Sequence, residues 1–343
     1  ENYAFFSGTS QYMKKHFYNF YLEILGFIKK NDIEKPTIVE IGCNDGILLE
    51  NFSSNGFVHY GVEPSKNVAD IAKNKNIKVI NDFFGQQSLG KIRKEIGKVD
   101  FFLAANVICH IEDLKSVFKN VSDNISDKGV FVFEDPYLGD VIEKTSYDQI
   151  YDEHVYLFSC LSLSMVAKIF DMELIDAKHQ VTHGGSMRYY IAKKSSYKVS
   201  KNVKDFLLKE KKQGLDNLKT FYQFSNNVKE SKKKLIEILE NNKKNNKKSC
   251  GYAATSKSTT ILNYCKIDQN LIDFISDTTP IKQNKFSPGM HIPIKDYEYF
   301  KNNMPNYAFL FAWNHFGEIN GKEKEFLSSG GRWITHVPSV KIL

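Results

Sequence analysis

The ten residues from Thr37 to Gly46, TIVEIGCNDG, combine residue types that suit a positively charged ligand. Apolar and β-branched residues lead into a turn that contains Gly42 and Gly46, and residues 47–52 read as the start of a helix. Glycine lets a backbone pass close to a ligand, and a strand–turn–helix unit of this kind builds a nucleotide pocket. Glu40 at the end of the strand repels phosphate and attracts a cation, and the turn lacks the G-x-G-x-x-G spacing of phosphate-binding versions.

A second acidic residue strengthens this interpretation over that of an ordinary turn with two glycines. Residues 58–64 read as the next strand and end on Glu63, roughly 20 positions after the turn, where a ribose diol is bound in such folds. The turn resembles motif I of the S-adenosylmethionine (SAM) methyltransferases, whose cofactor carries an ammonium and a sulfonium but no phosphate. We expect SAM to be bound by Glu40, Gly42, Cys43, Asn44, Gly46, Glu63, Pro64, Asp82, Phe83 and Asn106.

Length and composition bound the class of protein. A chain of 343 residues suggests about two domains. No apolar run approaches the roughly 18 residues that span a bilayer, so no membrane contact is expected. Five cysteines stand far apart without a C-x-x-C pair, which predicts free thiols in a reducing cytoplasm rather than a zinc site or a disulfide framework. The first residue is Glu1 rather than Met, so we expect a further segment upstream.

The net charge of +7 is local rather than general. Its excess of lysine lies between Lys193 and Lys248, a stretch that is rich in asparagine and almost without arginine. A basic stripe can bind nucleic acid, but this composition favours a solvated helical face, so no nucleic-acid partner is expected. The general bias toward lysine and asparagine suggests an A+T-rich bacterial source.

Alternation of strands and helices predicts a parallel sheet covered on both faces, the Rossmann-like arrangement of an α/β protein. An aromatic-rich helix running to about Lys30 precedes it as a cap or lid. Ligands bind such sheets at the carboxyl ends of the strands. The expected strands are 37–41, 60–63, 78–80, 99–105 and 129–134, and the expected helices are 47–55, 65–75, 88–96 and 112–126. Of Phe83 and Phe84, we expect one beside the adenine and one in the core.

Two segments after the fifth strand are dense in groups that suit a pocket. Residues 147–156, YDQIYDEHVY, are unusually rich in ionisable side chains. Residues 182–188 hold two glycines that let the backbone approach a ligand, with Arg188 as a cation. A hairpin turn explains these glycines equally well, and both interpretations stay open. Residues 157–170 read as a helix, and 173–177 and 187–192 as closing strands.

A helical connector and a smaller α/β unit complete the predicted organisation. Residues 200–248 read as helical with a break near Gly214, and strands are expected at 249–254, 271–276, 307–312 and 332–335. The turn 255–259 opens a helix with Lys257 and four hydroxyl groups, which suits a phosphate, although an ordinary helix cap is nearly as good an explanation. The predicted divisions are a cap (1–30), a methyltransferase domain (31–195), a connector (196–248) and a C-terminal α/β domain (249–343).

Taken together, the motifs resemble the SAM-dependent sugar C-methyltransferases, especially the C-3′-methyltransferases of nucleotide-linked 4-keto-deoxysugars. The resemblance covers nearly the whole chain. It rests on Ser7-x-x-Ser10-x-x-Met13-x-x-His16, Glu40-x-Gly42-x-x-x-Gly46, Tyr151-x-Glu153-His154, His183-Gly184-Gly185-Ser186-x-Arg188, Gly251-Tyr252-Ala253-Ala254-x-x-Lys257 and Pro288-Gly289-x-His291-Ile292-Pro293.

The resemblance implies roles for particular residues. His154 is the expected base, Tyr151, Glu153 and His110 line the sugar site, and the C-terminal domain helps hold a nucleotide diphosphate. The predicted substrate-binding residues are His183, Gly184, Arg188, Ser256, Lys257 and His291. Members of the family usually begin with a small zinc-binding domain that this sequence lacks, so zinc is expected only if such a domain lies upstream. An N-terminal aromatic is often Tyr in the family, and the candidates here are Tyr3, Phe5 and Phe6.

The implied reaction is carbon methylation through an enolate, with S-adenosylhomocysteine (SAH) as the product and no metal. His154 removes the C-3′ proton, and Tyr151 and His110 donate to the 4-keto oxygen as charge develops there. The source suggests a surface polysaccharide sugar, while its identity and the oligomeric state stay open. The alternatives are a sugar or small-molecule O-methyltransferase, a nucleic-acid methyltransferase and a non-catalytic scaffold. Residues 105–110 lack the Asn/Asp-Pro-Pro-aromatic motif of amino-group methyltransferases.

Overall fold

A computed structural model describes Gly8 and residues 10–343, and the chain forms two compact units. The first unit consists of the chain up to Asp135 together with residues 156–180 and 187–210. The second consists of residues 136–155, 181–186 and 211–343. The second unit therefore includes two segments that lie between strands of the first in the sequence. Ser7, Tyr3, Phe5 and Phe6, which the sequence analysis singled out, lie outside the described residues.

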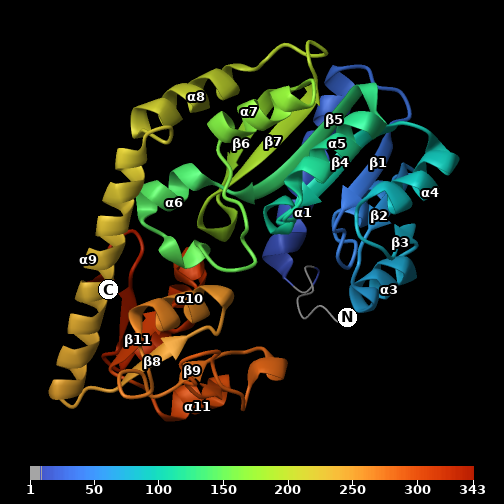
Figure 1. Ribbon diagram of the computed structural model, residues 1–343. Coiled ribbons are helices and arrows are strands. Elements are labelled where there is room, and N and C mark those ends of the chain that lie inside the picture. The colour runs from blue at the N-terminus through green and yellow to red at the C-terminus, as the bar shows by residue number, and fades with distance from the viewer. Residues whose placement is uncertain (1–7, 9) are drawn as a thin grey trace. The chain divides into compact units, whose positions relative to one another are not determined.

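A seven-stranded sheet organises the first unit in the order β3-β2-β1-β4-β5-β7-β6 (Figure 1). Strands β1 to β5 pair in parallel with their neighbours, and the strand order reverses between β1 and β4, which is where open α/β sheets bind ligands. The predicted Rossmann-like α/β fold is confirmed. The strands are β1 (Thr37–Ile41), β2 (Val58–Val62), β3 (Val79–Ile80), β4 (Val99–Ala105), β5 (Ile125–Pro136), β6 (Met172–Gln180) and β7 (Ser186–Lys193).

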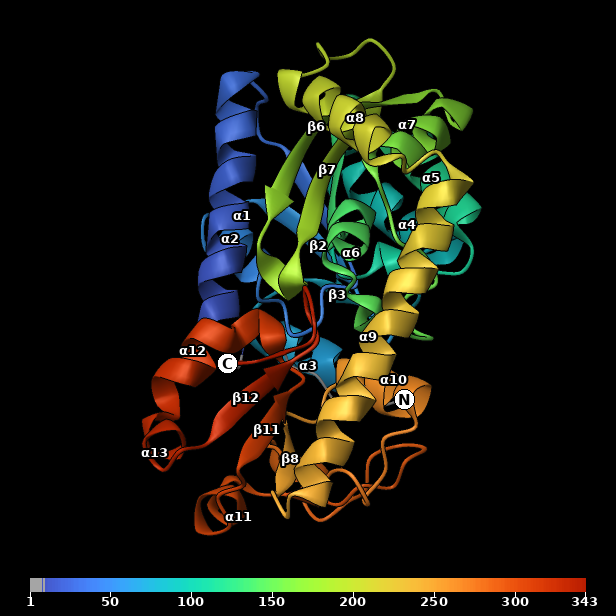
Figure 2. The ribbon, with the colours of Figure 1, turned by 90° about the vertical axis from the view of Figure 1, so that its left-hand side faces the viewer.

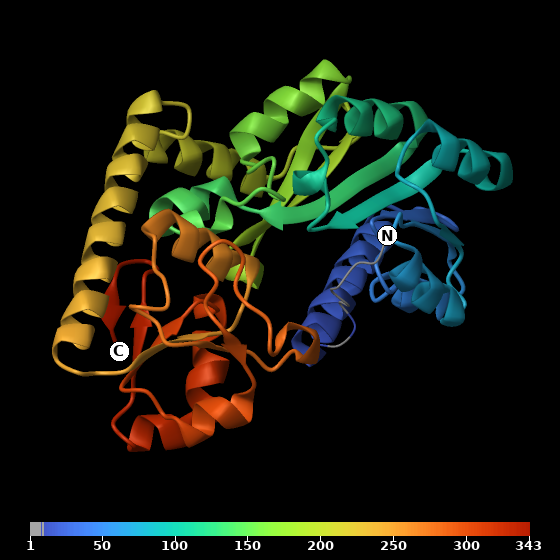
Figure 3. The same ribbon diagram turned by 60° about the horizontal axis from the view of Figure 1, so that its bottom comes forward.

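Alternate residues of β4 point to opposite faces of this sheet and explain why helices cover both. Phe101 and Leu103 join a core with side chains of α1 and α2, whereas Phe102 contacts Phe84 on the other face, where Phe118 of α5 packs on Phe131. Figure 3 shows α1 in blue on one side of the strands and α5 in teal on the opposite side. The helices are α1 (Gln11–Lys30), α2 (Leu49–Ser53), α3 (Lys66–Asn74), α4 (Gln86–Ile96), α5 (Leu114–Asn124), α7 (Cys160–Ile169) and α8 (Lys201–Gln213), with the short turn η2 (Ile108–His110).

The second unit contains a six-stranded sheet in the order β10-β9-β8-β11-β12-β13. Its strands pair in parallel except for β13, which is antiparallel to β12. Three strands of this sheet have only two residues each. A strand this short shows no alternation of apolar and polar residues, so β10 and β13 were not predicted. The strand expected at 271–276 is shorter in the structure and forms β9. The strands are β8 (Ser249–Tyr252), β9 (Ile275–Ser276), β10 (Ile294–Lys295), β11 (Tyr307–Leu310), β12 (Arg332–Thr335) and β13 (Lys341–Ile342).

Two apolar clusters cover the faces of this second sheet. Side chains of α9 and α10 pack with Phe309 and Ile334 on one face, where Figure 2 shows both helices, and Phe300 and Phe326 pack with Trp333 on the other. Gly214, with a φ of +72°, lies in the break between α8 and α9 that the sequence predicted. The remaining elements are α6 (Leu138–Lys144), α9 (Leu218–Lys244), α10 (Ser256–Cys265), α11 (Tyr297–Asn302), α12 (Phe316–Lys322), α13 (Lys324–Ser328), η3 (Tyr147–Gln149), η4 (Thr182–Gly184), η5 (Pro280–Lys282) and η6 (Trp313–His315).

The length and hydropathy of the helices can be compared with those of membrane-spanning segments. Within the described part of the chain, none of the helices has both the length and the apolar character that a bilayer crossing requires.

Comparing alanine substitutions at Gly42 and at Gly56 tests why the turn after β1 needs glycine. Both have positive φ values, of +67° and +75°, so alanine is strained by about 1–2 kcal/mol at either position. A Cβ at Gly42 lies 2.6 Å from Cγ2 of Val107, whereas a Cβ at Gly56 has open space. We predict that Gly42→Ala lowers the free energy of unfolding by about 1–3 kcal/mol more than Gly56→Ala does. Equal losses in denaturant titrations followed by circular dichroism would contradict this explanation.

Candidate active site

The turn after β1 is held in place by backbone hydrogen bonds and by β2. The Gly46 N–H donates to the carbonyl of Cys43 at 2.9 Å, and Asn44 adopts a φ of +51°. The Asn44 N–H donates to Oε2 of Glu63 at 3.0 Å, and the Ser65 N–H donates to the other oxygen of Glu63 at 2.9 Å. Glu63, which follows β2, therefore fixes the turn after β1. The ends of β1 and β2, both predicted to bind a ligand, are thus joined by hydrogen bonds.

Three buried carboxyl groups surround this turn, namely Glu40, Asp45 and Glu63, which are 3%, 4% and 6% exposed. Burial raises the pKa of Glu40 well above its usual range, and the neighbouring charges of Glu63 and Asp45 raise it further. Among the residues that the structure describes, no lysine, arginine or histidine forms an ion pair with any of the three. Oε2 of Glu40 and Oδ1 of Asp45 are buried without a hydrogen-bond partner. The turn therefore fits a cationic ligand such as SAM and disfavours a phosphate.

Asp45 was not among the predicted cofactor residues, although its position between Gly42 and Gly46 places it in the turn that was predicted to bind the cofactor. Besides facing Glu40, it accepts a hydrogen bond from the N–H of Gly8 at 2.8 Å. The side chain of Cys43, in contrast, belongs to the apolar core, so its backbone is the part that borders the turn.

The remaining predicted cofactor residues lie at the ends of neighbouring strands. Pro64 follows β2, and Asp82 accepts a hydrogen bond from the N–H of Phe83 after β3. Phe83 is 75% exposed, whereas the ring of Phe84 packs edge-on against Phe102 with the centroids 6.0 Å apart. Phe84 is thus the core member of the pair, and Phe83 stays the candidate for an adenine contact. Asn106 follows β4 with a φ of +54°.

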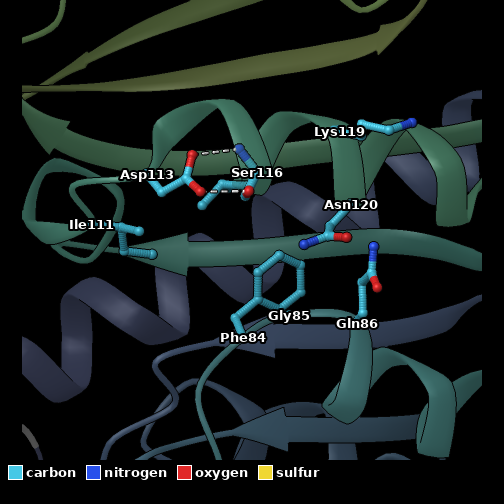
Figure 4. Close-up of a pocket in the computed structure, with 9 residues that line it drawn as sticks. Phe84, Gly85, Gln86, Ile111, Asp113, Ser116, Lys119 and Asn120 are labelled. Carbon is cyan, nitrogen blue, oxygen red and sulfur yellow. Dashed lines mark hydrogen bonds between the residues drawn. The ribbon is translucent and has the colours of Figure 1, made fainter.

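A cavity of about 330 Å³ opens between the start of α4 and α5, beside Phe84 (Figure 4). Phe84, Ile111 and Asn120 line it, and Asp113 accepts hydrogen bonds from the N–H and hydroxyl of Ser116 at its rim. None of the predicted cofactor residues lines the cavity. It therefore adjoins the expected adenine end of the site without containing it.

The loop that carries His110 is held by a buried acid that was not among the predicted site residues. The Cys109 N–H donates to Oδ2 of Asp135 at 3.1 Å, and the carbonyl of Cys109 accepts from the N–H of Tyr156 at 3.1 Å. Asp135 is fully buried, and burial raises its pKa to about 8, so it is mostly protonated at neutral pH. A neutral acid can accept this hydrogen bond without placing a charge in the core.

Tyr151 and His154 form a hydrogen-bonded pair in the second unit. The Tyr151 hydroxyl lies 2.8 Å from Nε2 of His154, and Nδ1 of His154 lies 2.8 Å from the carbonyl oxygen of Gln149. Because a carbonyl only accepts, Nδ1 carries the hydrogen and Nε2 of the neutral ring is the basic nitrogen, which accepts from Tyr151. Glu153, between them in the sequence, is exposed.

The loop 182–185 packs against residues of the same unit. Gly184 has a φ of +88°, and a Cβ there would lie 2.2 Å from the ring of Trp313, while a Cβ at Gly185 would lie 1.8 Å from Asp140. The side-chain amide of Gln149 donates to the carbonyl of His183 at 2.5 Å. Close packing alone therefore requires both glycines. The loop also connects His183 to Gln149, the residue that fixes the ring of His154.

A buried polar cluster lies at the carboxyl ends of β8, β11 and β12. Oδ2 of Asp148 accepts from the indole N–H of Trp313 at 2.6 Å and lies 3.5 Å from Nε2 of His336. Burial acts to raise the pKa of Asp148, but His336, Lys257 and Trp313 outweigh burial and lower it. The pKa of Lys257 is lowered by burial, against the attraction of Asp148. Lys257 therefore lies near Asp148, a residue distant in the sequence that the turn 255–259 alone could not predict.

The other predicted substrate residues occupy different environments. Ser256 and His291 are exposed, and Thr255 caps α10 by accepting from the N–H of Ser258 at 3.1 Å. Arg188 is 1% exposed, and Glu134 and Glu23 form ion pairs with it. The guanidinium group is thus engaged inside the first unit.

Comparison with known proteins gives matches along almost the whole chain. A methyltransferase domain model matches residues 13–177, and a C-methyltransferase C-terminal domain model matches residues 181–338. The C-methyltransferase NovU of Streptomyces niveus is 31% identical over 307 residues, which cover 89% of this chain and 73% of that protein. A ubiquinone biosynthesis O-methyltransferase of Coxiella burnetii is 25% identical over 97 residues, covering 28% of this chain and 42% of that protein.

Similarity to solved structures is weaker and is confined to about half of the chain. Magnesium protoporphyrin IX methyltransferase from Synechocystis PCC 6803 superposes with a TM-score of 0.39 at 11% identity, over 52% of this chain and 79% of that one.

The sheet order and the methyltransferase domain match define the first unit as a Rossmann-like methyltransferase domain. The chain belongs to the family of C-methyltransferases that includes NovU.

Glu40→Gln tests the cost of the buried charge at the turn. The unfolded chain ionises Glu40 at the ordinary carboxyl pKa, whereas the folded protein holds the proton to higher pH, so its stability falls as pH rises above that ordinary value. We predict that the neutral glutamine raises the melting temperature of the ligand-free protein at neutral pH, with a smaller gain under acidic conditions. Glu50→Gln, which changes a half-exposed carboxylate on α2, is the control and leaves the melting temperature nearly unchanged. A lower melting temperature for Glu40→Gln would contradict the argument.

Proposed function

We propose that the protein methylates a carbon atom, C-3′, of a nucleotide-linked 4-keto-deoxysugar with SAM as the methyl donor, in the synthesis of a surface polysaccharide sugar. Family membership supports carbon as the methyl acceptor. The observation that carries the proposal is the pair formed by Tyr151 and His154, which places a hydroxyl donor on the basic nitrogen of an oriented imidazole. Such a pair suits proton removal next to a ketone.

The donor is assigned by the charges at the turn after β1. Glu40, Asp45 and Glu63 are buried there without a cationic partner among the described residues, so a ligand with an ammonium and a sulfonium supplies what the site lacks. When bound, SAM supplies an electrophilic methyl group. Asn44 and Glu63 hold the backbone of the turn in the shape that admits the ligand.

The chain's own residues account for the acid–base steps. Nε2 of His154 takes the C-3′ proton as the C–H bond breaks. The electron pair of that bond spreads onto the 4-keto oxygen, which gives an enolate. The Gln149 carbonyl stabilises the imidazolium through Nδ1–H. The Tyr151 hydroxyl leaves Nε2 as that nitrogen takes the proton, and together with His110 it donates a hydrogen bond to the enolate oxygen. The enolate carbon then forms the new C–C bond with the donor's methyl group, SAH leaves, and His154 returns its proton to water.

The cluster around Lys257 is the proposed site for the diphosphate of the substrate. Lys257 lies in the first turn of α10, where backbone N–H groups and the helix dipole favour an anion. Burial lowers its pKa, and a diphosphate beside it would stabilise the charged form. His183 and Trp313 border the same region through the packing of Gly184.

Deuterium exchange at C-3′ separates the base from the methyl transfer. The protein is incubated with SAM and TDP- or GDP-linked 4-keto-6-deoxysugars in deuterated buffer, and mass spectrometry follows methyl gain and exchange. We predict that His154→Asn loses exchange and methylation together, by about 10²–10⁴-fold, because both need the same base. Tyr151→Phe weakens both less severely. Tyr156→Phe, which removes a hydroxyl bonded to the Glu112 carbonyl, is the matched control and stays near wild type.

Each other result has a distinct meaning. Near-wild-type exchange in a folded His154→Asn protein would refute the assignment of the base. Carbon and oxygen methyl groups differ in NMR chemical shift, so methylation of a sugar hydroxyl without exchange at any ketone would replace the proposal with O-methylation.

A further inference from the structure

The second unit repeats the strand order of the first. The order β10-β9-β8-β11-β12 corresponds to β3-β2-β1-β4-β5, and all of these neighbouring strands pair in parallel. In this correspondence β8 is equivalent to β1, and β9 is equivalent to β2. The strand order reverses between β8 and β11, so their carboxyl ends form a second position where an open parallel sheet binds a ligand.

Asp277, which follows β9, accepts the same kind of hydrogen bonds that Glu63 accepts after β2. Its Oδ2 accepts from the N–H of Ala254 in the turn after β8 at 2.7 Å, and its Oδ1 accepts from the N–H of Thr279 at 2.7 Å. Glu63 likewise accepts from the turn after β1 and from the N–H two residues further on. The acid follows the turn residue by 19 positions in the first unit and by 23 in the second. Asp277 therefore occupies the position of the acid that binds a ribose in such folds.

The carboxylate of Asp277 retains capacity to accept a further hydrogen bond. The residue is 7% exposed, close to the 6% of Glu63. An ionised carboxylate offers about four acceptor positions on its two oxygens. Among the described residues, Oδ1 receives only the Thr279 N–H, whereas Oδ2 receives the Ala254 N–H and lies 3.5 Å from Nζ of Lys282. Oδ1 can therefore accept a hydrogen bond from a hydroxyl group of a ligand.

Neighbouring lysines distinguish this acid from Glu63. Besides its contact with Asp277, Nζ of Lys282 donates to the carbonyl of Ala254 at 2.7 Å, and the lysine side chain is 41% exposed. Lys257 lies in the first turn of α10, which begins directly after the same turn. Among the described residues, no basic side chain forms an ion pair with Glu63. The turn after β8 is therefore compatible with a ribose that carries a diphosphate, whereas the turn after β1 repels negative charge.

We propose that Asp277 is a specificity-determining residue that accepts hydrogen bonds from the ribose hydroxyls of the substrate's nucleoside. The inference rests on the proposed function, which places the diphosphate at Lys257. A helix N-terminus and the acid after the second strand hold adjacent parts of one nucleotide in folds of this kind. The inference extends the proposed function by naming the class of carrier. A ribonucleotide such as GDP is preferred to TDP, whose sugar lacks the 2′-hydroxyl group.

Nucleotide pairs that differ only in the 2′-hydroxyl group test this role without the keto sugar. UDP, CDP and GDP are each compared with their 2′-deoxy forms, together with TDP, by calorimetric titration of the full chain. For whichever base binds, we predict that the ribonucleotide binds about 10- to 100-fold more tightly than its deoxy form, because the deoxy form lacks a hydrogen bond to a charged group. In Asp277→Asn, whose folding circular dichroism confirms, this ratio falls toward one because the carboxylate is lost.

The ratio separates a ribose contact from a structural role, because a distorted turn weakens the binding of both members of a pair equally. Asp273→Asn changes an exposed carboxylate two residues before β9 and is the control, which keeps the wild-type ratio. If Asp277→Asn does not fold, the ratio for the wild-type protein still decides.

Equal binding of ribonucleotides and deoxynucleotides by the wild-type protein, binding of TDP alone, or an unchanged ratio in folded Asp277→Asn would overturn the role of Asp277 and leave the proposed function standing. If none of the nucleoside diphosphates bound, the nucleotide-linked substrate of the proposed function would be refuted, and this inference with it.

Discussion

Uncompensated negative charge at the end of β1 is the constraint on which the cofactor unit depends. Glu40, Asp45 and Glu63 converge on one turn because the parallel sheet brings the carboxyl ends of β1 and β2 together. Their burial raises the pKa of Glu40 and stores an unfavourable free energy in the ligand-free protein. A cationic ligand relieves this cost, whereas a phosphate would increase it. The same strand–turn–helix geometry that serves dinucleotides elsewhere is thereby directed to a phosphate-free donor.

The second unit, unlike the turn after β1, pairs the buried carboxylates at its strand ends with basic side chains. Lys257 and His336 gather around the buried carboxylate of Asp148, and the start of α10 adds its helix dipole. This arrangement suits an anionic group such as a diphosphate. We therefore propose that the first unit recognises the cationic donor and that the second recognises the diphosphate of the acceptor. The Tyr151–His154 pair belongs to the second unit, although it precedes β6 of the first unit in the sequence.

Local patterns allowed the principal strands of both sheets to be predicted, because each carries an apolar run that ends at a turn. They predicted Glu40, Gly42 and Glu63 at one edge for the same reason. Contacts between distant segments could not be predicted in this way. The pairing of Asp148 with Trp313 spans 165 positions, and Arg188 finds Glu134 only through the neighbouring strands β5 and β7. The two-residue strands β10 and β13 are too short to show a period.

Calorimetric titration of SAM in buffers of different ionisation enthalpy tests the central claim most directly. If Glu40 is protonated in the free protein and the bound cation lowers its pKa, binding releases a proton and the affinity increases with pH. The observed heat then changes with the buffer for the wild type but not for Glu40→Gln, and NAD gives no comparable binding. Buffer-independent heats that are equal in both proteins, or tighter binding of NAD than of SAM, would contradict the account.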